Sequence, residues 1–328
     1  MQTNKVLFTQ TFCVITTLLF ARLIFHARSV SCIHEARWEI FQTVAVFTLY
    51  CCFFSKYYNA APTLQLKAAN VLFIASLTIG MSQHFIDSYR FYDAVLQQSI
   101  PAGAFLCLFI LVSLYAVSCG ISALERFSVF LFVLIMLSTI ILLVSLVPQM
   151  HLPNLQHGSF LLSDFIPKET MPRFPIELAL YPIVSNSRKT SNFYFRAFAF
   201  SAILDTVIFI LCEAILGSMF QKTLYPLQSA SRLGELSVFC RLDALYTITW
   251  MLISFYVFGF YAVLIYTLLQ HLSFKYAENE AYCYLLFIVP TAVFITWKLP
   301  FFTQVLASAS AVAAMLCSLC SRHSKRSK

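Results

Sequence analysis

Long apolar runs separated by short polar segments extend along the whole chain. Ten runs approach or reach the roughly 17–25 residues that a helix needs to cross the hydrocarbon core of a bilayer. They are 6–26, 38–55, 67–87, 101–120, 127–147, 170–187, 194–217, 242–270, 281–297 and 300–320, of which the second and sixth are short or interrupted. Because a run such as Val129–Val147 is continuously apolar and does not alternate like a barrel strand, we expect helices. The pattern predicts an all-α polytopic membrane protein with about ten transmembrane helices.

The two ends of this pattern need separate interpretation. The run 6–26 follows Lys5 as a signal peptide would, but it has spanning length and no clear small-residue cleavage site, so we expect a retained first helix. Only Lys298 and Pro300 separate the ninth run from the tenth. Since no Ser/Gly linker or low-complexity tract interrupts the chain, we predict a single transmembrane domain over 1–328.

The composition excludes several classes of protein. Hydrophobic residues make up 60% of the chain and charged residues 11%, whereas soluble domains average about 25% charged. So few charges cannot cover a soluble surface, which excludes a soluble enzyme, a nucleic-acid-binding module and a disordered protein. The formal net charge of +8 therefore indicates membrane orientation and lipid-headgroup contact, and no nucleic-acid partner is expected.

No motif for catalysis or for a cofactor stands out. The 11 cysteines lie mostly in apolar runs, where Cys packs as a small apolar residue, and the only CxxC is Cys317-Ser-Leu-Cys320. It lacks further ligands at metal-binding spacing, so we expect no metal and no cofactor. The nucleophile, phosphate-binding and zinc-protease motifs are absent as well, and we do not expect an enzyme.

Basic residues near the ends of the runs predict the orientation in the membrane. With ten spans and a cytoplasmic N-terminus, 12 of the 22 Lys and Arg residues fall on the inner side. The strongest anchor is the basic tail that contains Arg322, Lys325, Arg326 and Lys328. The tail places the C-terminus inside, and an even number of spans then places the N-terminus inside too.

The run order also suggests two inverted repeats of five helices, about 6–147 and 170–320. Transporters of this kind break the first helix of each repeat at the bilayer midplane. In the sixth run, Pro182 removes a backbone hydrogen bond and polar Ser185, Asn186 and Ser187 follow it, as expected of a broken helix. The first run contains neither Gly nor Pro, so only half of this pattern is present.

Ionisable residues inside spans are candidates for function because they are costly to bury in lipid. These candidates are His84, Glu177, Asp205 and Glu213. Asp205 and Glu213 are eight residues apart, about 80° around a helix, and could face one cavity. The alternative for each of the four is a structural hydrogen bond between helices, which we favour most for His84. Glu125 and Arg126, just before the fifth run, look like a charged pair at the membrane boundary.

Four segments together resemble the spore germination permease family, which comprises the B subunits of nutrient germinant receptors and is related to amino acid/polyamine/organocation transporters. The resembling segments are Val117-Ser-Cys-Gly-Ile-Ser-Ala-Leu-Glu-Arg-Phe-Ser128, Leu152-Pro-Asn-Leu with Gly158, Glu177 with Tyr181-Pro182, and Cys240-Arg-Leu-Asp-Ala-Leu-Tyr-Thr-Ile-Thr-Trp250. They occur in the family's order, and the last one is the most specific.

The resemblance implies a ten-helix LeuT-like fold in the inner membrane of bacterial endospores. It implies assembly with a larger membrane A subunit and a lipoprotein C subunit, and sensing of a small nutrient such as an amino acid. Ligand sites in the family lie between the first, third, sixth and eighth helices. The positions here that lie in matching motifs are Glu177, Tyr181, Pro182 and Asp243.

Two other functions remain open. The first is a secondary amino acid transporter, against which the missing Gly in the first run argues. The second is an assembly-only subunit without ligand binding, which the same run favours. A membrane enzyme ranks behind both.

Overall fold

The computed structural model describes helices and their connections. The described residues are 9–20, 52–53, 56–57, 66–96, 101–151, 153–154, 176–184, 191–217, 219, 223, 225–234, 242–272 and 282–326. Within these ranges no β-strand occurs, in agreement with the expected all-α class. The second predicted run, 38–55, lies almost wholly outside them.

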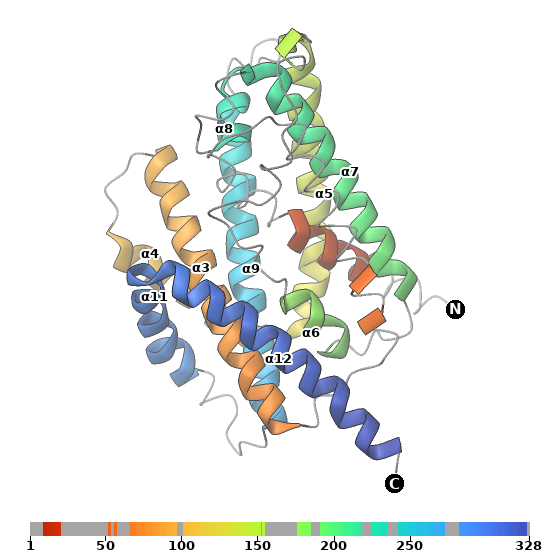
Figure 1. Cartoon of the computed structure of the whole chain (residues 1–328). Coiled ribbons are helices and arrows are strands. Elements are labelled where there is room, and N and C mark those ends of the chain that lie inside the picture. The colour runs from red at the N-terminus through yellow and green to blue at the C-terminus, as the bar shows by residue number, and fades with distance from the viewer. Residues whose placement is uncertain are drawn as a thin grey trace. The chain divides into compact units, whose positions relative to one another are not determined.

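The helix Thr9–Phe20 is the first described element (Figure 1). The later elements are α3 (Lys67–Leu96), α4 (Ala102–Cys119), α5 (Ile121–Leu146), the 3₁₀ turn η1 (Val147–Gln149), α6 (Ile176–Val184), α7 (Ser191–Leu216), α8 (Pro226–Ser231), α9 (Asp243–His271), the π-helical turn η5 (Tyr284–Ile288), α11 (Val289–Lys298) and α12 (Pro300–Arg326). By length and composition, five described helices can cross a membrane: Lys67–Val95, Ala102–Cys119, Ile121–Gln149, Ala199–Leu216 and Asp243–His271.

Helix boundaries agree with the hydropathy pattern where an apolar run ends abruptly. The eighth run, 242–270, matches α9 to within one residue. Leu299, with φ −130° and ψ 60°, leaves the helical conformation between α11 and α12, and Pro300 opens α12, where its missing N–H costs nothing. The short interval between the ninth and tenth runs is therefore a true break.

Two helices extend beyond their apolar runs. Helix α3 continues past 87 to Leu96, because the aromatic rings of its last turns pack on α4: the Tyr92 and Phe105 ring centroids lie 4.9 Å apart. Helix α5 begins at Ile121, directly after Gly120, whose φ of +75° ends the preceding helix α4. Hydropathy places both boundaries several residues too far inside the helix, since these extensions carry polar residues, some buried, such as Ser88 and Glu125, and some exposed, such as Asp93 and Arg126.

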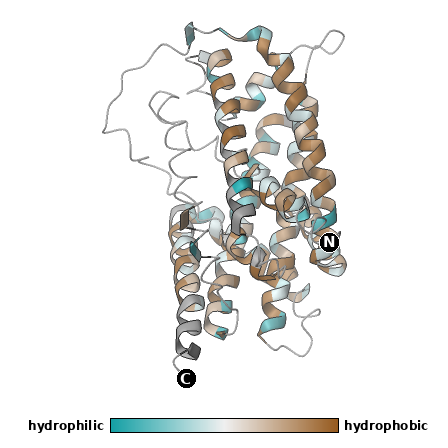
Figure 2. Ribbon diagram, turned by 90° about the vertical axis from the view of Figure 1, so that its right-hand side faces the viewer, coloured by the Kyte–Doolittle hydropathy of each residue, from teal (hydrophilic) through white to brown (hydrophobic). Residues whose placement is uncertain are grey.

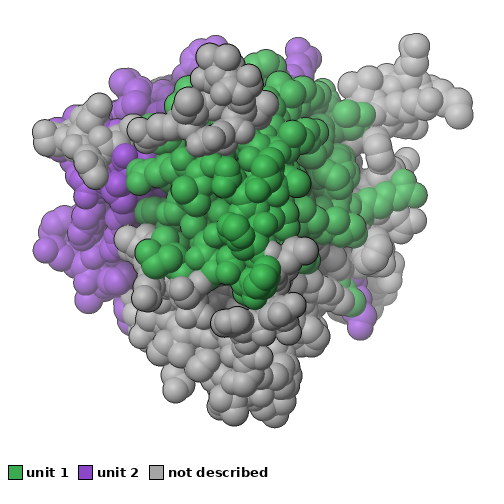
Figure 3. Space-filling model, turned by 90° about the horizontal axis from the view of Figure 1, so that it is seen from above, with its two compact units in different colours: residues 1–55, 128–170, 192–253 green, residues 56–127, 171–191, 254–328 purple. Residues whose placement is uncertain are grey.

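The chain forms two compact units, each built from three segments (Figure 3). Unit 1 comprises 1–55, 128–170 and 192–253, and unit 2 comprises 56–127, 171–191 and 254–328. Each unit draws on both of the predicted repeats. Helix α5 passes from unit 2 into unit 1 after Phe127, and α9 passes from unit 1 into unit 2 after Ile253.

Unit 2 is organised around α3, which packs against α4, α6, α11 and α12 (Figure 1). The Ser76 hydroxyl donates to the Ala307 carbonyl at 2.8 Å, which joins α3 to α12 through a small-residue stretch of the latter. The Thr78 and Tyr284 hydroxyls are hydrogen-bonded, so α3 is also joined to η5. Ser76 and Thr78 thus join α3 to neighbouring helices, whereas the Ser82 and Ser88 hydroxyls donate to carbonyls of α3 itself.

Unit 1 holds the helix Thr9–Phe20 together with α7, α8, most of α5 and the start of α9. The Phe12 ring lies 5.8 Å from the rings of both Phe132 and Phe200, which links the first helix to α5 and α7. Along α5 and η1, side chains at heptad spacing are more than half exposed: Phe130, Val133, Leu137, Ile140, Val144 and Val147. An exposed apolar stripe on this scale fits lipid contact, and the long helices are predominantly apolar in Figure 2.

Candidate functional site

Helix α6 carries the two side chains that the sequence singled out on the sixth run. Glu177 stands in its first turn, and Tyr181 follows four residues later, so both point to the same side of the helix. Both side chains are buried, at 2% and 0% exposure. Helix α6 therefore presents a carboxyl group and a phenol to the interior of unit 2.

Each of these side chains has a partner on a different helix of unit 2. The Tyr261 hydroxyl of α9 donates to Oε2 of Glu177 at 3.2 Å. The Tyr181 hydroxyl donates to Oε1 of Glu125, in the first turns of α5, at 3.1 Å. The Tyr181 ring also packs on Phe260 of α9, with centroids 5.7 Å apart. Two buried carboxyl groups are thus held by two buried tyrosines across three helices.

Helix α3 completes this cluster. A Cβ atom at Gly80 would lie 3.3 Å from the Tyr261 hydroxyl, so the absence of a side chain lets α9 bring that tyrosine close. One turn further, Nε2 of His84 donates to the Ser254 carbonyl of α9 at 3.0 Å. Since a carbonyl only accepts, the proton is assigned to Nε2. Of the two roles considered for His84, the geometry fits an interhelical donor.

Pro182 lies inside α6, which continues as a helix to Val184. Proline has no N–H and cannot donate to the carbonyl four residues before it, so α6 lacks one backbone hydrogen bond near its C-terminal end. The polar residues 185–187, on which the predicted break depends, lie outside the described residues. The helix Thr9–Phe20 is continuous, as expected from its lack of Gly and Pro.

Three further candidates belong to unit 1. Asp243 opens α9, where a carboxylate interacts favourably with the helix dipole, and its Oδ2 lies 3.9 Å from Nε of Arg232. Glu213 is buried on α7. Asp205 lies on the same helix, and its side chain is outside the described part. The described structure gathers Glu177, Tyr181 and His84 in unit 2, and Asp243, Asp205 and Glu213 belong to unit 1.

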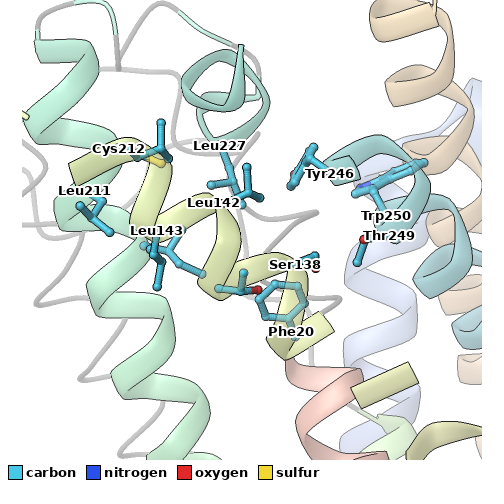
Figure 4. A pocket seen from close by; sticks show the side chains of 13 residues that line it. Phe20, Ser138, Leu142, Leu143, Leu211, Cys212, Leu227, Tyr246, Thr249 and Trp250 are labelled. Carbon is cyan, nitrogen blue, oxygen red and sulfur yellow. The ribbon is translucent and has the colours of Figure 1, made fainter. Parts of the chain in front are cut away.

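Unit 1 also contains a cavity of about 20 Å³ between α5, α7, α8 and α9, with Phe20 at one side (Figure 4). Its lining is mostly apolar, with hydroxyls from Ser138, Thr139, Tyr246 and Thr249. A water molecule needs roughly 10–15 Å³ on this measure, so the space holds one water molecule and not an amino acid. Among the residues that the structure describes, no group of three or more His, Cys, Asp or Glu side chains could hold a metal ion.

Sequence reasoning missed two members of the cluster in unit 2. Glu125 was interpreted as a boundary charge because it precedes the fifth apolar run, yet it is 8% exposed and accepts from Tyr181. The sequence feature that could have identified Glu125 is its place in the family-like motif Val117–Ser128. Tyr261 lies within the apolar run of α9 and is 6% exposed. Nothing in the sequence around it distinguishes it from a packing aromatic.

The described helices define an all-helical membrane protein that contains a buried cluster of carboxyl groups and tyrosines. The family model described as spore germination protein matches residues 70–301, more than two thirds of the chain. The chain therefore belongs to the spore germination protein family. A comparison with curated proteins finds no match.

Proposed function

We propose that this chain is the integral-membrane B subunit of a spore nutrient germinant receptor, which senses a small nutrient such as an amino acid. The family match over 70–301 carries the proposal, because it includes α6 and the opening of α9. The proposed location is the spore inner membrane with both termini inside, in a complex with an A subunit and a lipoprotein C subunit.

The ligand site we propose is centred on α6. Glu177 is a carboxyl group in an apolar interior, and a carboxylate binds an ammonium group through charge-assisted hydrogen bonds. A small zwitterion bound there would also meet the end of α6 and its dipole. If binding favours one conformation of the chain, it shifts the population of the whole complex toward germination. Pro182 is the further position on α6 that the family resemblance adds to this site. Asp243, which the resemblance also names, belongs to unit 1 and is not part of the site proposed on α6.

The first prediction tests this assignment in spores. Glu177→Gln and Tyr181→Phe should each raise the concentration of an equimolar amino-acid mixture needed for half-maximal germination by about tenfold or more, since a hydrogen bond to a charged group contributes roughly 1.5–3 kcal/mol. Germination is followed by loss of optical density. The matched control is Tyr115→Phe, because Tyr115 is 72% exposed on α4. Unchanged dose–response curves for both α6 variants, at normal protein levels in the spore membrane, would show that the site is wrongly assigned.

Two alternatives have distinct outcomes. A secondary amino acid transporter would take up labelled amino acids into proteoliposomes in response to an ion gradient, without A and C subunits. An assembly-only subunit would co-purify with A and C partners while the amino-acid mixture leaves its thermal stability unchanged. The missing Gly and Pro in the first helix still disfavour transport, because a continuous helix offers no free backbone groups to an ion.

A further inference from the structure

Two hydrogen bonds, one helical turn apart, fix how α6 is turned within unit 2. At Glu177 the helix accepts from Tyr261 of α9, and at Tyr181 it donates to Glu125 of α5. Because the two partners lie on different helices, α9 and α5, a rotation of α6 about its axis would break these bonds. The carboxyl group of Glu177 is therefore held in a set orientation by Tyr261.

The position of Tyr261 depends in turn on α3. A Cβ atom at Gly80 would lie 3.3 Å from the Tyr261 hydroxyl, which is tighter than ordinary packing, and 3.4 Å from Cε1 of its ring, which is an ordinary contact. The His84 bond to the Ser254 carbonyl fixes α9 against α3 two turns before Tyr261. The hydroxyl thus lies against Gly80 of α3 and donates to Glu177 of α6.

We propose that Tyr261 is a positioning residue for the ligand site on α6, and that Gly80 is the position of α3 that admits it. This inference rests on the proposed function, because it takes Glu177 as a ligand-binding group. With Oε2 oriented by the Tyr261 hydroxyl, the carboxyl group is preorganised for a small ligand that carries an ammonium group. The coupling from Gly80 through Tyr261 to Glu177 makes the response to that ligand depend on a residue of α3 that need not touch it.

A double-mutant cycle between positions 80 and 261 tests the proposal. The variants are Gly80→Ala, Tyr261→Phe and the double variant, in spores that contain the partner subunits. The matched control is Gly103→Ala on α4, because an added Cβ there has no neighbour within 4 Å. Both substitutions replace a helical glycine by alanine, and only the one at Gly80 places the new methyl group against Tyr261.

Gly80→Ala and Tyr261→Phe should each raise the half-maximal concentration of the amino-acid mixture about tenfold, which corresponds to about 1.4 kcal/mol, with full final germination. The double variant should match Tyr261→Phe alone, because the methyl group added by Gly80→Ala acts through the hydroxyl that Tyr261→Phe removes. Gly103→Ala should match the unsubstituted chain. The inference would be overturned if the increases in half-maximal concentration were additive in the double variant. It would also be overturned if the variants changed thermal stability but not the half-maximal concentration.

A second measurement separates failure of this inference from failure of the proposed function. If spores with the unsubstituted chain do not respond to the mixture, the receptor function fails. The same cycle is then measured as free energy of unfolding of the purified chain in detergent. Non-additivity of about 1.4 kcal/mol supports the coupling of Gly80 and Tyr261, and additivity overturns it.

Discussion

The neighbours of a side chain, more than its chemical type, decide what it contributes to this protein. Leu137 and Leu142 lie on the same helix five residues apart, yet Leu137 is 55% exposed and Leu142 is 4% exposed beside the cavity of unit 1. Glu125 shows the same effect: its position in the sequence resembles that of a charge at the membrane boundary, but in the structure it is buried and accepts a hydrogen bond from Tyr181.

Leu142→Ala should destabilise the protein by roughly 2–5 kcal/mol, because it removes buried methyl groups and enlarges an existing cavity. Leu137→Ala removes the same atoms from the exposed stripe and should change stability by less than about 1 kcal/mol, a matched control. Thermal unfolding of the two purified variants in detergent makes the comparison. Equal losses would mean that the α5 stripe is covered by protein in the folded chain.

The C-terminal end of α7 in unit 1 is capped by residues of a distant connecting segment. The C-terminal end of α7 leaves carbonyl groups without intrahelical donors. The His151 backbone N–H and Nδ2 of Asn154 both donate to the Ala214 carbonyl, at 3.1 and 2.9 Å. Gly217 follows at φ +50°, with Asn154 against it. The segment Leu152-Pro-Asn-Leu, which resembles a family motif, thus contains the cap of α7.

Gly217→Ala should destabilise the protein through both the backbone and the cap of α7. Gly217 has φ +50°, so an alanine there is strained by roughly 1–2 kcal/mol. The new Cβ would also lie 3.0 Å from the Asn154 side chain and displace its hydrogen bond to α7, which should add about 1 kcal/mol. Urea or thermal unfolding of Gly217→Ala, alone and combined with Asn154→Ala, measures the two contributions. In an Asn154→Ala background the extra loss should disappear, and its persistence would contradict the capping role.

At the scale of the whole molecule, the basic residues predict the membrane orientation, whereas the shapes of the side chains determine how the helices pack. Apolar length places the helices in lipid, and the basic tail of α12 is expected to keep the C-terminus inside. The division into two units has a different origin. Each unit combines segments that are distant along the chain, such as α3 with α12 in unit 2, through small side chains and hydroxyls.

The orientation can be measured with a fluorescent protein fused after Lys328, which should fluoresce because it stays on the inner side. Replacement of Arg322, Lys325, Arg326 and Lys328 by glutamine should lower the inside fraction, since these charges oppose translocation. Replacement of the same number of tail residues that carry no charge is the control. Protease protection of the fused domain in inside-out vesicles would contradict the predicted topology.

Local pattern was enough to predict the all-helical membrane class, the bounds of α9, the break at Leu299 and Glu177 as an ionisable group inside a span. These follow from hydropathy, from proline and from the cost of burying charge, which act on neighbouring residues along the chain. The family motif that contains Glu177 added Tyr181. Tertiary structure alone revealed Tyr261, Glu125 and Gly80 as their partners, and extended α3 and α5 beyond their apolar runs. The hydrogen bond between Tyr181 and Glu125 spans 56 positions of the chain, and the one between Tyr261 and Glu177 spans 84. Only the packing of the helices decides which of many similar tyrosines and glycines meet.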